Sequence, residues 1–357
     1  MTSPSGLQIL WFGLIIVLWV GYFLLEGFDF GVGILSPFVG KDDVERRMVL
    51  GTIGPFWDGN EVWLLTAGGA TFAAFPLWYA TLFSGFYLAL FIILVALIVR
   101  GVGFEFRHQR EDARWRTTWD WLLFTGSLVP SVLWGVAFAD ILQGVPINAH
   151  HIYTGTLLDL INPYSLLGGL TSAGLFTLYG ATFLCLKLTG PPADRAHTIA
   201  HRLSLPVTAV VFAFLAYTLV NAINATDTGI VPGPIPILAV VLVGLTPILI
   251  RYHLHGWAFS FAGSSIALVV LTLFLNLYPR VLVSSTSKAF SLTIVQSSST
   301  PYTLTVMTIV AAIFVPVVLV YTGWTYWVFR QRLTRDQFEL PRLLQKKPLT
   351  PPTPKET

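Results

Sequence analysis

The sequence predicts an all-α integral membrane protein with nine transmembrane helices. Composition, the recurrence of apolar runs and the distribution of charge each support this fold class. Of the 357 residues, 54% are hydrophobic and 11% are charged, and the mean hydropathy is +0.71. A soluble globular domain carries about 25% charged residues. Long apolar runs recur along the chain, and about 20 apolar residues are enough to cross a bilayer core about 30 Å thick.

The apolar runs and the residues that break them define the expected spans. Pro234 and Pro236 are expected to open the seventh span, and Pro247 to kink it. The first run has no basic region before it and no small-residue cleavage site after it, so we expect a retained helix and not a secretory signal. The nine expected spans are residues 7–28, 52–75, 78–100, 119–142, 164–186, 204–223, 235–251, 257–278 and 301–328.

The basic residues predict the orientation of the chain in the membrane. With these spans, 19 of the 21 Lys and Arg residues fall on one side, and only Arg280 and Lys288 fall on the other. The positive-inside rule makes the first side cytoplasmic, which places the N-terminus outside and the C-terminus in the cytoplasm. We therefore expect residues 29–51, 100–118 and 187–203 to be cytoplasmic.

The domain organisation follows from the same pattern. Residues 1–335 are expected to form a single polytopic membrane domain, and the proline-rich, basic residues 336–357 a disordered cytoplasmic tail. The excess of positive charge is interpreted as cytoplasmic loop charge that faces anionic membrane lipids. The sequence has no pattern of interleaved aromatic and basic residues, which argues against nucleic acid as a partner.

Ionisable residues inside the spans are the first candidates for function, because each costs about 2.5–3.5 kcal/mol at a helix centre. Glu26 and Asp29 are expected to close the first span, and Asp58 and Glu61 to open the second. A spacing of three residues places each pair on one helix face. We expect the four carboxylates to converge near the cytoplasmic side.

The surroundings of these acids leave two interpretations open. Arg100, Glu105 and Asp120 are expected at similar depth, so an ion pair between Arg100 and a carboxylate is within reach. Taken singly, such residues fit structural ion pairs and helix caps; as a cluster they favour a path that carries protons inward from the cytoplasm. For Asp58, Thr52 is expected to cap the helix and Pro55 to lie in its first turn.

The sequence also predicts that this chain binds no haem or metal. A haem inside a membrane bundle needs axial ligands such as His or Met at membrane depth. All seven histidines are expected in loops or at span ends, with His253 and His255 in one solvated loop, and Met307 is the only methionine inside a span. The histidines show no convergent ligand spacing, and Cys185, the only cysteine, is interpreted as a core residue.

Several motifs match a known family. The chain resembles subunit II of cytochrome bd-type quinol oxidases up to about residue 335, most closely before residue 150 and least from 188 to 255. The motifs that carry this resemblance are Glu26-Gly-Phe-Asp29-Phe-Gly-Val-Gly33, Glu45-Arg-Arg47, Gly54-Pro-Phe-Trp57-Asp58-Gly-Asn-Glu61-Val-Trp63, Arg100-Gly-Val-Gly-Phe-Glu105, Trp119-Asp120-Trp121 and Leu142-Gln-Gly-Val-Pro146.

The resemblance implies two four-helix bundles (about 7–142 and 164–278) plus a peripheral ninth helix (about 301–328), paired with a haem-bearing subunit I. Subunit I would hold two b haems, one d haem and the quinol site, while this chain would be haem-free. The complex would oxidise quinol, reduce oxygen to water and take protons from the cytoplasm in an electrogenic reaction of a bacterial respiratory chain. The resemblance also leaves room in this chain for a structural quinone, in the space that holds haems in subunit I, although the sequence shows no specific pocket for it. The sequence decides neither which quinone is used nor whether small accessory subunits attach.

Residue roles follow from the same resemblance. Asp58 matches the family's proposed proton-uptake acid, and Trp63 lies at its proposed oxygen access. Arg100 and Asp29 match positions tied to haem integrity, and Trp57 with Glu105 and Asp120 is assigned an electrostatic or structural role near the subunit interface. Two alternatives remain: a proton-coupled secondary transporter, which usually shows inverted repeats that this sequence lacks, and a purely structural scaffold subunit.

Overall fold

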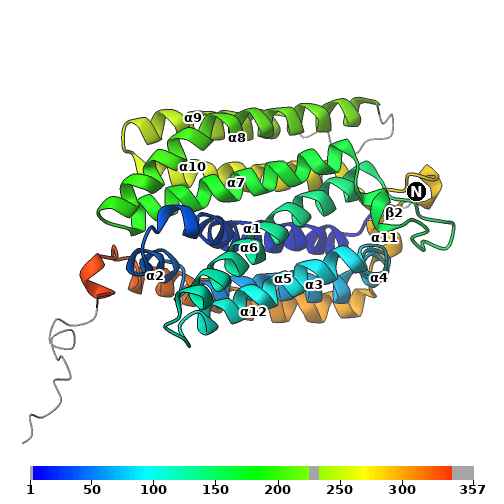
Figure 1. Ribbon diagram of the computed structural model, residues 1–357. Helices are drawn as coiled ribbons and strands as arrows, with labels where there is room; N and C mark the ends of the chain where they lie inside the picture. The colour runs from blue at the N-terminus through cyan, green and yellow to red at the C-terminus, as the bar shows by residue number, and fades with distance from the viewer. Residues whose placement is uncertain (1–2, 225–232, 340–357) are drawn as a thin grey trace, which may run out of the picture.

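The computed structural model describes residues 3–224 and 233–339, most of which are helical (Figure 1). Within these residues, seven helices are long and apolar enough to cross a membrane. The seven helices are α1 (Gly6–Val39), α5 (Tyr87–Phe106), α6 (Ala113–Gln143), α7 (Pro163–Lys187), α8 (Pro191–Asn224), α10 (His255–Leu277) and α12 (Pro301–Val328). Two further helices of similar direction, α3 (Trp57–Ala74) and the shorter apolar α9 (Ile235–Arg251), pack among them.

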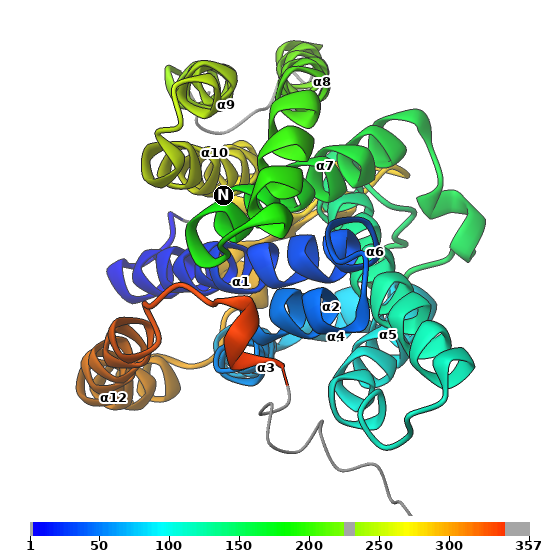
Figure 2. The same ribbon diagram turned by 60° about the vertical axis from the view of Figure 1, so that its left-hand side comes forward.

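The helices form two groups that meet at α1 and along the contact of α6 with α7. Helices α3, α5 and α6 pack with α1 or with each other on one side, and α7, α8, α9 and α10 pack together on the other (Figures 1 and 2). Helix α1 contacts α7 closely because Gly31 and Gly180 face each other: a Cβ on Gly180 would lie 2.5 Å from the carbonyl carbon of Gly31. Such small residues let helix backbones approach in a membrane, where packing and not hydrophobic exclusion drives association.

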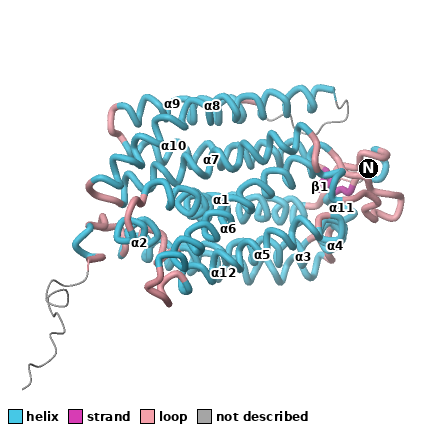
Figure 3. Tube along the Cα trace, viewed as in Figure 1, coloured by secondary structure: helices cyan, strands magenta, loops and turns pink. Residues whose placement is uncertain are grey.

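The loops gather at the two ends of the molecule (Figure 3). One end, which we call the α2 end, carries the short helix α2 (Asp43–Gly51), the α5–α6 and α7–α8 turns and the 3₁₀ helix η3 (Arg335–Gln337). The opposite end, the α11 end, carries α4 (Pro76–Gly85), η1 (Leu157–Leu160), η2 (Lys288–Phe290), α11 (Ile294–Ser297) and the antiparallel strands β1 (Arg280–Leu282) and β2 (Leu292–Thr293). Arg280 and Lys288 are therefore at the α11 end, opposite the other described basic residues.

Two of the expected helix boundaries are wrong in the first third of the chain. Helix α1 continues to Val39 and not to residue 28, so Glu26 and Asp29 lie in its interior. The charges and glycines that ended the apolar run are tolerated because they are buried against α3, α5 and α7. The third expected span, 78–100, is broken at Phe86 into α4 and α5.

The expected start of the second span is also wrong. Helix α3 begins at Trp57, its N-cap Phe56 makes no side-chain cap, and the Thr52 hydroxyl instead donates to the Val49 carbonyl at 2.6 Å. Thr52 and Pro55 therefore belong to the turn between α2 and α3. The reason is the amphipathic α2, which ends at Gly51 and leaves residues 52–56 to reverse the chain.

Helix α8 begins at Pro191, well before the expected residue 204, so most of segment 187–203 is helix and not loop. Pro191 and Pro192 suit a first helical turn, where a missing N–H costs nothing. At the other end of the chain, Phe338 packs on Gly51 and Arg335 binds Asp42 at 2.8 Å, so the beginning of the expected tail contacts α2. The rest of that tail, residues 340–357, lies outside the described residues.

Candidate functional site

A buried ion pair joins α1 and α5 in the interior of the protein. The Arg100 guanidinium donates to Glu26 Oε1, and both residues are 0% exposed. The guanidinium also lies 4.9 Å from the ring centre of Phe30 and 5.6 Å from that of Phe104, within the range of a cation–π interaction. The expected ion pair between Arg100 and a carboxylate is therefore present. Its partner is Glu26, and not Glu105 or Asp120, which were expected at a similar depth in the membrane.

A second buried acid lies one turn along α1. Asp29 is fully buried and accepts a hydrogen bond of 2.6 Å from Asn60 Nδ2 on α3. The Asn60 amide also donates to the Leu25 carbonyl at 3.0 Å, and its oxygen accepts from the Tyr326 hydroxyl of α12 at 3.0 Å. Asn60 and Tyr326 carry no charge, so the sequence pattern did not mark them as members of this site.

Glu26, Asp29, Asn60 and Arg100 form what we call the buried acid cluster. It holds two carboxyl groups against one guanidinium, so one carboxyl has no counter-charge of its own. Glu26 Oε2 and Asp29 Oδ1 are buried and have no hydrogen-bond partner within the described chain. Because an isolated buried carboxylate is costly, this arrangement can hold a proton and pass it on.

The other predicted acids of α3 lead from the surface toward this cluster. Asp58 is exposed in the first turn of α3, and Glu61 is partly buried one turn later. Glu61 lies close enough to Glu26 and Arg100 for their charges to interact. The four carboxyl groups therefore range from exposed (Asp58) through partly buried (Glu61) to fully buried (Glu26 and Asp29).

The predicted aromatic residues pack around α3. The Trp57 ring stacks on Phe104 with centres 4.9 Å apart, next to the Arg100 side chain. Trp63 packs on α1 at Gly21, where a Cβ would lie 2.4 Å from its ring. Trp63 thus fills the contact between α1 and α3.

Asp120 and Glu105 do not join the buried acid cluster. Asp120 is buried at the α2 end, where it accepts from Arg46 and from Arg107 at 2.6 Å each. Arg107 also pairs with Asp43 at 3.0 Å, so this network ties α2 to α5 and α6. Glu105 is exposed.

A second ion pair fastens α2 to α8. Glu45 binds Arg195 at 2.5 Å and accepts from the Lys41 N–H at 2.8 Å. Burial opposes ionisation of Glu45, but the hydrogen bonds from Arg195 and Lys41 prevail and hold the pKa of this carboxyl below its ordinary value. The carboxylate form is therefore the one that docks α2.

Two groups of residues were missed. Asp140, buried in α6 near the α11 end, accepts from Asn162 Nδ2 at 2.7 Å, and its position inside an apolar run was a usable signal. His197, His253 and His255 lie together at the α2 end, where the His197 ring stacks on His253 and meets His255 edge-on, although His197 was expected apart from the loop of His253 and His255. Their sequence spacing could not reveal this, because they come from α8, the α9–α10 turn and the start of α10.

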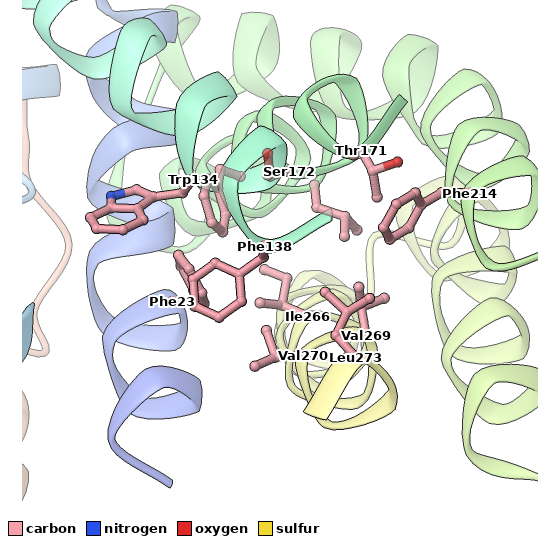
Figure 4. Close-up of a pocket in the computed structure, with 14 residues that line it drawn as sticks. Phe23, Trp134, Phe138, Thr171, Ser172, Phe214, Ile266, Val269, Val270 and Leu273 are labelled. Carbon is pink, nitrogen blue, oxygen red and sulfur yellow. The ribbon is translucent and has the colours of Figure 1, made fainter. Parts of the chain in front are cut away.

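Two of the cavities in the described part of the chain are lined mainly by apolar side chains. A small one of ≈50 Å³ lies between α1, α6, α7, α8 and α10, where the labelled side chains of Figure 4 are apolar apart from Trp134, Thr171 and Ser172. It is far smaller than the roughly 300 Å³ of a small-molecule pocket. A larger groove of ≈750 Å³ is lined by residues of α1, α3, α4, α5, α6 and α10, among them Trp19, Leu64 and Trp78, and by Phe86 between α4 and α5.

Comparison with known proteins agrees with the resemblance in the motifs. A family model described as cytochrome bd terminal oxidase subunit II matches residues 7–329. Cytochrome bd ubiquinol oxidase subunit 2 of Bacillus subtilis (strain 168) is 43% identical over 333 residues, which cover 93% of this chain and 98% of that protein. Cytochrome bd-I ubiquinol oxidase subunit 2 of Escherichia coli (strain K12) is 40% identical over 374 residues, covering 95% and 98%.

The fold agrees as well. A chain in the structure of bd oxidase from Geobacillus thermodenitrificans matches with a TM-score of 0.71 at 17% identity, covering 91% of this chain and 97% of that chain. With a family model that matches almost the whole chain and relatives at this level of identity, the chain belongs to the family of cytochrome bd terminal oxidase subunit II.

Proposed function

We propose that this subunit of a bacterial membrane-bound quinol oxidase conducts protons from the α2 end to the interior of the complex. The observation that carries the proposal is the series of acids from exposed Asp58 through half-buried Glu61 to fully buried Glu26 and Asp29. Oxygen reduction consumes protons, and an acid at a helix start can take one up from water. A proton held on the uncompensated carboxyl of the buried acid cluster could then move on toward the partner subunit.

The haems of the complex are proposed to lie in subunit I, as two b haems and one d haem. All seven histidines of this chain are described; six lie in loops or in the first two turns of a helix, and His201 lies exposed in the third turn of α8. Met307 of α12 is partly buried. A histidine or methionine pair at mid-membrane depth, the usual axial ligation of a b-type haem, is therefore not available from these residues.

In the proposed orientation, the α2 end is cytoplasmic. The proposed number of membrane crossings is nine, because α3 and α9 are added to the seven long apolar helices. The concentration of basic residues at the α2 end supports it. Protons taken from this side would make the reaction electrogenic. Helix α12, most of whose residues are exposed, would contact membrane lipids and any small accessory subunits.

We further propose that the larger groove binds a structural quinone. It is lined almost entirely by apolar side chains, as an isoprenoid tail requires, and Trp78 Nε1 in its wall is buried without a hydrogen-bond partner within the described chain. That N–H could donate to a quinone carbonyl, and a quinone bound there would stabilise the packing of α3 to α6. Leu64 and Leu65 on the same wall follow Trp63 directly, which supports the proposed access of apolar oxygen past this residue.

The test of proton conduction is Asp58→Asn in the assembled oxidase. This variant keeps the size and hydrogen bonding of the side chain but removes the exchangeable charge. We expect reduced-minus-oxidised spectra to keep the b and d haem bands, while quinol-driven oxygen consumption falls at least about tenfold, roughly 1.4 kcal/mol of barrier. Asp58→Glu should restore part of the rate.

The matched control is Glu111→Gln, which neutralises an exposed loop acid at the same end of the molecule. It should leave turnover unchanged. If Asp58→Asn also leaves turnover unchanged, or removes the haems together with activity, the acids are structural ion pairs and the subunit is a scaffold.

A further inference from the structure

Four potential metal ligands lie together at the α2 end, away from the buried acid cluster. Cys185 lies near the end of α7, His197 in the second turn of α8, and His255 at the start of α10. One ligand atom from each of these three residues lies within 4.8 Å of the other two. His253, in the turn before α10, stacks on His197 with ring centres 4.5 Å apart and planes at 8°.

We propose that these residues form a zinc site in which Cys185, His197 and His255 bind the ion. In tetrahedral zinc sites, bond lengths of about 2.0–2.3 Å place the ligand atoms roughly 3.3–3.8 Å apart. Rotation of the side chains can shorten the distances between the ligand atoms by about 1 Å, which would produce this geometry. The three residues come from three different helices, so the bound ion would fasten α7, α8 and α10 together.

The hydrogen bonding of the cluster leaves its ring nitrogens available. His197 Nδ1 and His255 Nδ1 are both buried and have no hydrogen-bond partner within the described chain. A buried polar atom normally has a partner, so two such atoms beside a thiol require an explanation. A metal ion supplies one, because it would accept a lone pair from each ring.

The ligand types favour Zn²⁺. A thiolate and imidazoles suit a borderline-soft ion, whereas Mg²⁺ and Ca²⁺ prefer oxygen ligands. The exposed His253 offers a fourth nitrogen after rotation of its ring, or leaves that position to water. A solvent-accessible residue at the rim also provides a route by which the ion can enter.

Burial disfavours a thiolate at Cys185, and the positive charge of Arg332 partly offsets this cost. Arg332 Nη2 donates to the Cys185 carbonyl at 2.9 Å, and its charge acts on both Cys185 and His255. Asp194 and His201 act on His197 from the same helix. Arg332 opposes a bare cation, so binding depends on the thiolate, which makes Cys185 the decisive ligand.

The experiment measures metal in the purified two-subunit complex. The complex is dialysed against buffer with micromolar free Zn²⁺ and then against metal-free buffer, and zinc per mole of complex is measured by mass spectrometry. We expect about one retained zinc in the unmodified complex, and a loss of at least about tenfold in Cys185→Ser and in His255→Gln. His201→Gln, which changes an exposed histidine one turn beyond His197, should retain the ion.

Zinc-edge X-ray absorption of the unmodified complex provides a second measurement that needs no variant. It should show one sulfur at about 2.3 Å and nitrogens at about 2.0 Å. A zinc shell without sulfur, zinc retained in Cys185→Ser, or no retained zinc in the unmodified complex would each overturn the proposal. Intact haem spectra and oxygen consumption in the variants would show that loss of zinc does not reflect misfolding.

Discussion

At the scale of single residues, the Glu26–Arg100 pair shows what a buried ion pair contributes to the stability of a membrane protein. Both side chains are fully buried, and the Arg100 Nε and Nη2 atoms have no hydrogen-bond partner within the described chain. Desolvation of two charges can cost more than their attraction returns, so the pair by itself is weak evidence of net stability. Its integrity nevertheless matters, because loss of either partner leaves the other charge buried and uncompensated.

Arg100→Gln is therefore expected to destabilise the subunit strongly, by about 3–5 kcal/mol, since it leaves two buried carboxyl groups without a cation. The measurement is the yield and thermal midpoint of the purified complex. Arg114→Gln, which neutralises an exposed arginine at the same end, should change stability by no more than about 0.5 kcal/mol. Equal effects of the two variants would contradict a specific role of the buried pair.

The docking of α2 is expected to depend on pH through Glu45. Its pKa in the folded protein lies below the ordinary value of 4.5, because Arg195 and the Lys41 N–H bind the carboxylate. The resulting stability is fully present above pH 4.5 and is lost as the pH falls through the lower folded pKa. The pKa of Asp42, lowered by the Glu45 N–H and Arg335 against the effect of burial, acts in the same direction.

Hydrogen exchange of residues 41–51, corrected for the intrinsic effect of pH, measures this dependence. Protection should be constant from pH 7 to about 5 and fall below pH 4.5. Glu45→Gln should lower protection already at pH 7 and weaken the acid dependence. Protection that is unchanged by the variant would show that Arg195 does not hold α2 through this carboxyl.

At the scale of elements, the contact of α1 with α7 depends on the absence of side chains. Gly180→Ala would place a Cβ 2.5–2.6 Å from backbone atoms of Gly31, which cannot move independently of the helix. We expect a loss of at least about 1–3 kcal/mol, measured as thermal stability of the complex. Gly323→Ala in α12 meets nothing within 4 Å and should be neutral; a neutral Gly180→Ala would imply that the two helices are farther apart.

The sequence predicted elements well where one rule decided the outcome. Apolar runs located the long helices. Glu26 and Asp29 were recognised as candidate site residues because a charge inside an apolar run is costly to bury and therefore indicates a function or a partner. The predicted helix boundaries were wrong where tertiary packing overrode the local sequence signal. Helix α1 continues through two acids because Arg100 and Asn60 bind them. Helix α8 begins before the apolar run because its first turns pack at the α2 end.

Contacts between distant segments were beyond the reach of the sequence. No pattern along the chain relates Asn60 to Tyr326, which lie 266 positions apart and meet through a hydrogen bond of 3.0 Å. The histidine cluster was missed for the same reason, because His197 comes from α8 whereas His253 and His255 come from the distant α9–α10 turn and the start of α10. The charge of a single residue can be recognised in the sequence. Which neutral or isolated side chains come together can be known only from the fold.

At the scale of the whole molecule, the subunit is polarised along its length. The α2 end carries the ion-pair networks of Asp120 and Glu45 and most of the described basic residues, whereas the α11 end is built from polar turns and a two-stranded sheet. The acids of the proposed proton path open toward the α2 end. The direction of proton uptake and the membrane orientation of the subunit are therefore one question.

Introduced cysteines can answer it, because the only natural cysteine, Cys185, is 3% exposed and should stay silent. Arg110→Cys lies at the α2 end and Thr286→Cys at the α11 end, and both positions are exposed. A membrane-impermeant maleimide applied to intact spheroplasts should label residue 286 but not residue 110, which should react only after permeabilisation, because the positive-inside rule places the basic end in the cytoplasm. Labelling of residue 110 from outside would reverse the orientation, and Asp58 would then face the outer side, where it could not take up cytoplasmic protons.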